Sequence, residues 1–325
     1  MIRAVVIAAC ITAGVSASVS AEAAGATPLQ VEYYQLRLTL PPGAAVRQTL
    51  KRTTESETNG KVIRTRLEAE YLSQLSRHPD GYRVFKALVN TAFQVEGPEA
   101  DAERLELEKV MRAAASIRDI TYIADESLTP LRLENWPQLR NRLKAAMRRS
   151  GAINAREGDA FDGLYGPMTA ETAAEQFLPE DALLAIPHNL GLSLNNPYRL
   201  DSLINGPFGD TISARESLTL TAWDEAKGEA EVLYESGPTR EALDAYAKRI
   251  RPALEQAAAR SARIRKAAPV PVGDIQLDIG TSCRYRISLK TGLVSRAECQ
   301  SVRDIRQGDD RRRHRESWVL GETIK

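Results

Sequence analysis

Alternation of apolar and polar residues dominates the first third of the chain. From Ile63 to Tyr71, the odd positions carry apolar residues or Thr, and the even positions between them carry Arg or Glu. This is the period of a strand with one buried face. A similar alternation runs over Val31–Leu40, and Asn59-Gly60 and Asp80-Gly81 are turn signals. The pattern predicts a meander of about four antiparallel strands with one face in solvent.

Helical spacing follows, and then strands return. Apolar residues recur every three or four positions in Ala100–Ala114 and Trp136–Arg149. Alternation resumes in Ile212–Ala222 and precedes the longest helical pattern, Thr239–Lys266, where we expect Pro252 to kink or split the helix. The sequence therefore predicts an α+β fold, with curved antiparallel sheets, helices packed on one face and two similar halves.

A change in composition separates the two halves. The stretch 151–167 holds four glycines and no sustained period, so it is predicted to be a linker or surface loop. We expect an N-terminal α+β domain over 24–150 and a C-terminal α+β domain over 168–325. A last strand is expected near Glu316–Thr323.

The first residues have the pattern of an export signal. Ala4–Val19 carries no charge after Arg3, and Ala21-Glu22-Ala23 forms an A-x-A site. We expect a signal peptide over 1–23, cleavage near Ala23, and a periplasmic or secreted protein. Ile7–Cys10 also has the residue types of a lipoprotein box, but its apolar region is very short, which disfavours an acylated Cys10. No later stretch is long enough for a transmembrane segment.

Charge and histidine content limit the possible partners. Lys and Arg number 44 against 43 Asp and Glu, so nothing indicates a nucleic-acid partner. His78, His188 and His314 have no second His or Cys at ligand spacing, so we predict no metal and no cofactor. Only His188 is kept as a candidate contact residue. The run 309–315 around His314 is interpreted as a solvated bend, with contact to anionic headgroups or polysaccharide as the alternative.

Two cysteines remain after removal of the signal peptide. Lys290-Thr291-Gly292 lies midway between Cys283 and Cys299, flanked by alternating segments. A three-residue hairpin loop with a left-handed Gly, centred on Thr291, places Leu289 opposite Leu293 and Cys283 opposite Cys299. We therefore predict a Cys283–Cys299 disulfide in an oxidising compartment, with two buried thiols as the alternative.

No catalytic constellation is visible in the sequence. Lys290-Thr291-Gly292 matches one motif of penicillin-recognising serine enzymes, but no Ser has a Lys three residues later, and a G-x-S-x-G elbow is absent. We therefore predict no catalytic residue and favour a protein that is not an enzyme. Dispersed acid pairs that act on glycans leave no sequence signature, so a hydrolase of that kind stays open.

Two features are candidates for contact with a ligand or partner. The apolar strand face with Ile63, Leu67 and Tyr71 is a candidate for one wall of a groove between the sheet and loosely packed helices. Phe208, in the turn-rich stretch 205–209, is a candidate anchor for a partner, and the alternative is that it folds back over the core.

One short run resembles known proteins. Ile120–Trp136, which reads ITYIADESLTPLRLENW, resembles stretches in uncharacterised secreted proteins of proteobacteria, and Glu316-Ser317-Trp318 is similar to them too. At the level of the expected fold, the chain looks like periplasmic lipoprotein carriers. We expect a non-enzymatic extracytoplasmic binding or carrier protein for an apolar or lipid-like ligand. The alternatives are an envelope interaction or assembly factor that uses loops such as 205–210, and an unrecognised hydrolase with dispersed carboxylates.

Overall fold

The computed structural model describes residues 32–98, 102–154, 157–207, 210–265, 272–308 and 310–325. The expected signal peptide with Cys10, and the candidate contact residue Phe208, lie outside the described residues. No helix among the described residues is long and apolar enough to cross a membrane.

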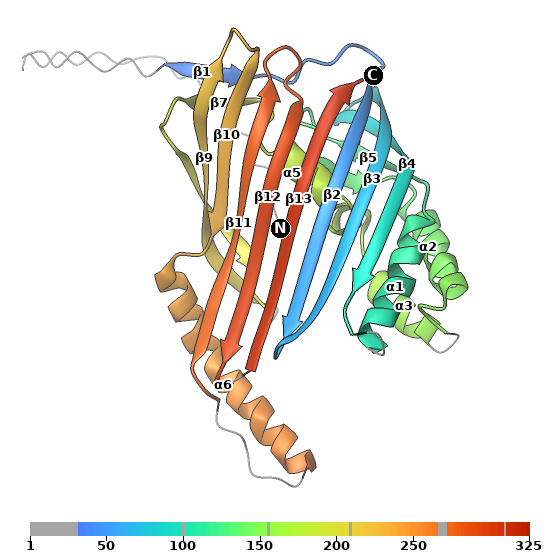
Figure 1. Ribbon diagram of the computed structural model, residues 1–325, viewed down its shortest axis with the longest axis vertical. Coiled ribbons are helices and arrows are strands. Elements are labelled where there is room, and N and C mark those ends of the chain that lie inside the picture. Colours follow the sequence, from blue (N-terminus) through green and yellow to red (C-terminus); the bar gives the residue numbers. More distant parts are fainter. Residues whose placement is uncertain (1–31, 99–101, 155–156, 208–209, 266–271, 309) are drawn as a thin grey trace, which may run out of the picture.

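One antiparallel sheet dominates the part of the chain that the structure describes (Figure 1). In spatial order its eleven strands are β6 (Pro130–Leu133), β5 (Asp119–Ala124), β4 (Gly81–Glu96), β3 (Lys61–His78), β2 (Ala45–Thr58), β13 (Asp310–Ile324), β12 (Val294–Gln307), β11 (Ile275–Ser288), β10 (Glu229–Gly237), β9 (Thr211–Asp224) and β8 (Tyr198–Asn205). A separate pair joins β1 (Tyr33–Leu36) to β7 (Leu190–Ser193).

The helices gather in groups along this sheet. They are α1 (Ala102–Ala115), α2 (Trp136–Ser150), α3 (Glu157–Tyr165), α4 (Ala170–Phe177), α5 (Pro179–Ala185) and α6 (Arg240–Arg265). In Figure 1, α1, α2 and α3 lie together beside β4, and α6 lies at the opposite side of the sheet. The α5 helix packs on the sheet itself, where the Tyr285 hydroxyl donates to the Leu183 carbonyl at 2.9 Å.

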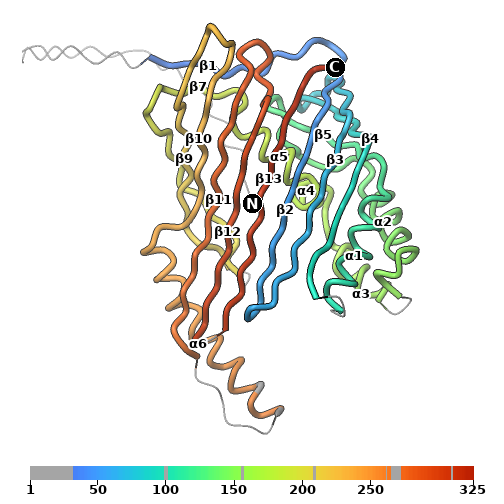
Figure 2. The backbone as a smooth tube through the Cα atoms, in the orientation of Figure 1, coloured from blue at the N-terminus to red at the C-terminus, as the bar shows by residue number. Residues whose placement is uncertain are grey.

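Strands from both predicted domains belong to the same sheet. The β13 strand pairs with β2 from Arg312 opposite Thr58 to Ile324 opposite Val46 (Figure 2). The α+β class with a large antiparallel sheet is confirmed, whereas the similarity of the two halves stays a prediction.

The hairpin with the disulfide shows both agreement and difference. Cys283 lies opposite Cys299, and the two form a disulfide, as predicted. The loop between β11 and β12 is longer than three residues, because the Leu289 backbone N–H does not pair within the hairpin. It donates instead to the Gly228 carbonyl oxygen at 2.8 Å. A β-bulge after Arg286 absorbs the shift in register. Gly292 is left-handed as expected, and a Cβ there would lie 2.2 Å from the Arg37 carbonyl oxygen.

Three other local predictions differ from the structure. The expected loop over 151–167 contains α3, because Phe161 is buried and packs on the Tyr165 ring at 4.5 Å. The described part of the expected solvated bend, residues 310–315, is instead the first part of β13, whose Arg311 binds Asp304 on the neighbouring strand at 2.7 Å. The α6 helix continues through Pro252, so it is not split there.

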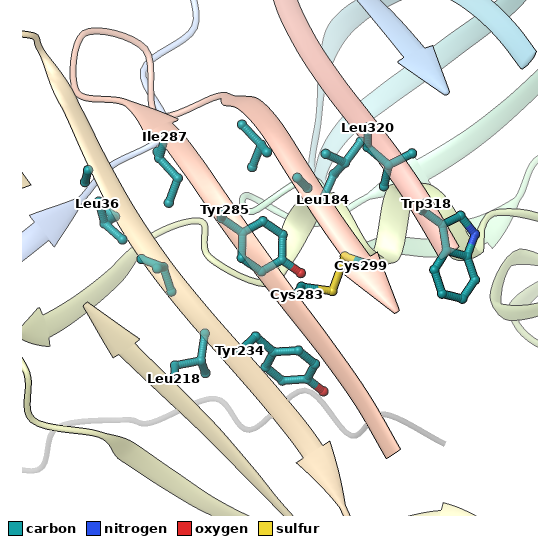
Figure 3. Close-up of a cluster of buried hydrophobic side chains, with 14 of the residues drawn as sticks. Leu36, Leu184, Leu218, Tyr234, Cys283, Tyr285, Ile287, Cys299, Trp318 and Leu320 are labelled. Atoms are coloured by element: carbon teal, nitrogen blue, oxygen red, sulfur yellow. A yellow bond between two sulfur atoms is a disulfide. The ribbon is translucent and has the colours of Figure 1, made fainter. Parts of the chain in front are cut away.

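The largest buried cluster lies where β9–β13 and β2 meet α5. Figure 3 shows the Cys283–Cys299 disulfide between Tyr285 and Trp318, with Leu184 of α5 and Leu320 of β13 nearby. Alternating residues of neighbouring strands share one face, so the face that carries the two cysteines also carries these apolar groups. This part of the sheet is closed by its own side chains and by α5.

Candidate functional site

A cavity of about 500 Å³ lies beside this closed core, between the sheet and the helices next to β4. Its walls come from β2, β3, β4, β5 and β13 on one side and from α1, α2, the end of α4 and the start of α5 on the other. The apolar part of the lining includes Leu67, Leu88, Met111, Ile120, Leu143 and Phe177. Ligand pockets commonly fall between about 300 and 1,000 Å³ and have mostly apolar walls. The cavity therefore has the size and character of a site for a small apolar molecule.

The helical wall follows from the spacing of apolar residues. Leu107 and Met111 are four residues apart on α1, and Leu139 and Leu143 are four apart on α2, so each pair lies on one helix face. These side chains face Leu67 and other alternating residues of the sheet. Two amphipathic helices thus cover the sheet without filling the space above it.

A chain of polar contacts marks the β13 side of the cavity. Ser56 on β2 lies opposite His314 on β13, and its hydroxyl is 3.0 Å from His314 Nδ1. His314 Nε2 is 3.1 Å from Glu316 Oε1, and Arg52 Nη2 lies 2.6 Å from the same oxygen. Thr54 and Thr65, paired across β2 and β3, also line the cavity.

The charge on Glu316 is held in place by its neighbours. Burial alone would raise the pKa of the Glu316 carboxyl, but the hydrogen bond with His314 and the charge of Arg52 more than offset it, so the pKa is below its ordinary value. An ionised Glu316 accepts a hydrogen bond from a protonated His314 Nε2. In the tautomer that carries its proton on Nε2, Nδ1 is free to accept a hydrogen bond from the Ser56 hydroxyl.

A second charged cluster joins β4 to α5. Lys86 Nζ lies 2.6 Å from Asp181 Oδ2 and 3.5 Å from Glu180 Oε1, and it sits 4.3 Å from the centre of the Tyr71 ring. Burial lowers the pKa of the Lys86 ammonium, but the two carboxylates outweigh it and raise the pKa above its ordinary value. The Tyr122 hydroxyl donates to Asp181 Oδ1 at 3.0 Å. These contacts fix the start of α5 on the sheet.

A much smaller cavity, of about 20 Å³, lies on the other side of Asp181. Gln48, His188 and Glu322 line it together with apolar residues. Burial, together with the nearby Asp181 charge, raises the pKa of Glu322 to about 8. Glu322 is therefore mostly protonated at neutral pH. Burial also lowers the pKa of His188, whose Nδ1 is 2.8 Å from the Ser127 carbonyl oxygen.

The candidate residues from the sequence fall in different places. Leu67 and Tyr71 line the large cavity. Ile63 is buried on the same strand but is not part of the lining. His188 lines the small cavity instead. The structure thus brings two of the predicted contact residues to the site.

Several residues of the site were missed. Lys86 lies between Val84 and Leu88 on one strand face, and an ionisable residue on an otherwise apolar face is a signal that could have been used. Ser56 and His314 are 258 positions apart, and no local pattern connects them.

Comparison with known proteins adds no further assignment. No protein-family model matches the chain, and no curated protein matches it. The function must therefore be inferred from the cavity and from the side chains around it.

Proposed function

We propose that this chain is an extracytoplasmic binding or carrier protein whose large cavity holds an apolar, lipid-like ligand. The observation that carries the proposal is the cavity of about 500 Å³ with apolar side chains on both its sheet wall and its helical wall. An apolar ligand that enters such a space removes its own surface and that of the walls from water, and this is the main source of affinity in sites of this kind.

The two walls support this function over an assembly role. A sheet face sealed by helices would have favoured an envelope assembly factor, but Leu67 and Tyr71 instead border the cavity. The disulfide between Cys283 and Cys299 supports the extracytoplasmic part of the proposal, because structural disulfides persist in oxidising compartments.

The proposal is tested by titrating the purified chain with a palmitic-acid analogue that carries a fluorophore. Ala115→Phe adds a ring where α1 lines the cavity, so we expect at least tenfold weaker binding than in the parent protein. Ala102→Phe adds the same ring at an exposed position at the start of α1 and should bind as the parent does.

Saturable binding that only Ala115→Phe weakens would support the cavity as the site. The proposal would be overturned by a parent protein that shows no saturable binding, or by equal binding in both variants.

A further inference from the structure

The polar end of the cavity holds a serine, a histidine and a carboxylate in one hydrogen-bonded series. We propose that Ser56 is the nucleophile of an esterase activity on esters with apolar acyl chains. His314 is the general base, and Glu316 is the positioning residue that holds its ring. This inference rests on the proposed function, because the acyl chain would occupy the same apolar cavity.

The distances fit the roles. The Ser56 hydroxyl is 3.0 Å from His314 Nδ1, and His314 Nε2 is 3.1 Å from Glu316 Oε1. A nucleophile within hydrogen-bond reach of a base, and a base oriented by a third group, is the geometric signature of an activated serine. Such constellations occur on unrelated folds and are recognised by geometry, not by chain order.

The sheet makes this arrangement rigid. Ser56 and His314 are paired residues on adjacent strands, and Glu316 follows two residues later on the same face of β13. Their backbone positions are therefore fixed by the ladder of interstrand hydrogen bonds. Arg52, four residues before Ser56 on β2, binds Glu316 from its other side at 2.6 Å. Sites on strands of this kind keep their geometry better than sites on loops.

The series is accessible from the cavity. Ser56, His314 and Glu316 all line it, and the side chain of His314 is 45% exposed whereas that of Glu316 is 17% exposed. A base that can be reached and a carboxylate that is sheltered suit the proposed division of roles. Of the three histidines of the chain, His188 binds a carbonyl and His78 binds within its own turn.

Hydroxyls and carboxylates also meet elsewhere on this sheet without a histidine. The Tyr234 hydroxyl is 3.2 Å from Glu216, and no imidazole is part of that contact. A polar strand face alone therefore does not produce the Ser56 arrangement. What distinguishes it is the imidazole between hydroxyl and carboxylate, at the end of a cavity with apolar walls.

The reaction needs only the ester and water. As Ser56 Oγ bonds to the acyl carbon, its proton passes to His314 Nδ1. The tetrahedral intermediate then collapses, the bond to the alcohol oxygen breaks, and the alcohol leaves with that proton. Water attacks the acylated Ser56 and gives a proton to His314, which returns it to Ser56 Oγ as the carboxylic acid is released. Thr54 and Thr65 are the hydroxyl donors of this cavity face that could contact the carbonyl oxygen.

The test combines covalent labelling with turnover. The parent protein is treated with a fluorophosphonate that carries an alkyl chain, and the labelled peptide is identified by mass spectrometry. Turnover is followed with p-nitrophenyl esters of increasing acyl length. We expect one label per chain on Ser56 and a rate that rises with acyl length. Ser56→Ala should lose the label and at least about a hundredfold in kcat/KM.

Controls separate chemistry from folding. Ser317→Ala removes an exposed serine from the opposite face of β13 and should react as the parent does. Ser56→Ala should still bind the fluorescent palmitic-acid analogue, which shows that it is folded. Glu316→Gln should lower kcat with little change in KM, and a merely structural contact would not produce that split.

The outcomes distinguish this inference from the proposed function. Binding of the fatty-acid analogue without labelling, and with no turnover above that of Ser56→Ala, would overturn the esterase and leave the binding role intact. Labelling at a different residue would also overturn it. Labelling of Ser56 with turnover, but without saturable binding of the analogue, would support the activity and contradict the apolar ligand.

Discussion

Two clusters of charged side chains on one face of the sheet, one around Lys86 and Asp181 and one around Arg52 and Glu316, differ in their exposure and in the groups that they contact. The sealed cluster, the Lys86–Asp181 pair, has 2% and 8% of its two side chains exposed, whereas Arg52 and Glu316 in the open cluster are 32% and 17% exposed. Lys86, Arg52 and Glu316 all line the same cavity, so the clusters differ in exposure and not in location. In the sealed cluster the contacts of Asp181 and Glu180 hold α5 against the sheet. In the open cluster Glu316 instead orients an imidazole toward a hydroxyl. A pair of a cation and a carboxylate thus holds α5 on the sheet in the first cluster and orients the His314 imidazole in the second.

The difference begins in the sequences of β2 and β13. Along one face of β2, Val46 and Leu50 are buried, and the next residues on that face, starting with Arg52, are polar. Along the paired face of β13, the buried Leu320 and Trp318 give way to Glu316 and His314. One face of a strand can belong to the core at one end and to a polar site at the other only if its residues change from apolar to polar along the strand. Here the two changes lie one same-face pair apart, because Arg52 on β2 is opposite the buried Trp318 and Thr54 is opposite Glu316.

Breaking the sealed cluster should have the largest effect. Asp181→Asn leaves Lys86 buried with its nearest anion removed and also weakens the Tyr122 contact. We expect a loss of about 3–5 kcal/mol in the free energy of unfolding, measured by urea denaturation. Replacing both partners in Lys86→Met with Asp181→Leu should restore part of it. A loss under about 1 kcal/mol in the single variant would contradict a sealed pair.

The pH dependence of stability should report the same enclosed region. Glu322 has a pKa of about 8 in the folded protein against 4.5 as its ordinary value, so the folded protein keeps this proton to higher pH than the unfolded chain. Its contribution is therefore full below about pH 4.5 and is lost as pH rises toward 8. We expect a decline on the order of 3 kcal/mol between pH 5 and pH 8 from this group.

Glu322→Gln checks this contribution. The variant should match the parent at pH 5 and be more stable at pH 8, by urea denaturation at both pH values. Glu68→Gln, at an exposed carboxylate on β3, should leave the parent's pH dependence unchanged. If the free energy of unfolding changed equally with pH in the parent and in Glu322→Gln, the raised pKa of Glu322 would be contradicted.

The same kind of substitution in the open cluster should have the smallest effect. Glu316→Gln keeps a hydrogen-bond acceptor beside Arg52, and solvent can reach both groups, so we expect a loss of about 1 kcal/mol or less. Thermal and urea unfolding provide the measurement. A cost as large as that of Asp181→Asn would mean that the two clusters are equally structural and would remove the contrast between them.

Local patterns were sufficient for much of the fold. The cysteine register was predictable because Cys283 and Cys299 are close in the chain and the alternation around them fixes which residues share a face. Asn59-Gly60 likewise predicted the turn between β2 and β3, where both residues are left-handed. These features depend on a few neighbouring residues, whose preferences can be read from the sequence.

The site itself depends on contacts that no local pattern encodes. The charged run 309–315 indicates a bend because its arginines lie beside acids in the sequence, yet the structure pairs residues 312–315 with β2 and sets Arg311 against Asp304. Once that pairing was missed, Ser56 could not be placed beside His314. The cavity also depends on how α1 and α2 lie over the sheet, which the spacing of their apolar residues does not determine.

The position of β13 between β2 and β12 has a consequence for how the molecule is made. Ribosomes synthesise β2 long before β13, and until residues 310–324 are present, β2 and β12 each leave an edge without its neighbour. Exposed edges of long strands are prone to pair with other chains. Contacts between such distant parts of a chain also form slowly. Until residues 310–324 pair with them, β2 and β12 are therefore the edges at which another chain would pair most readily.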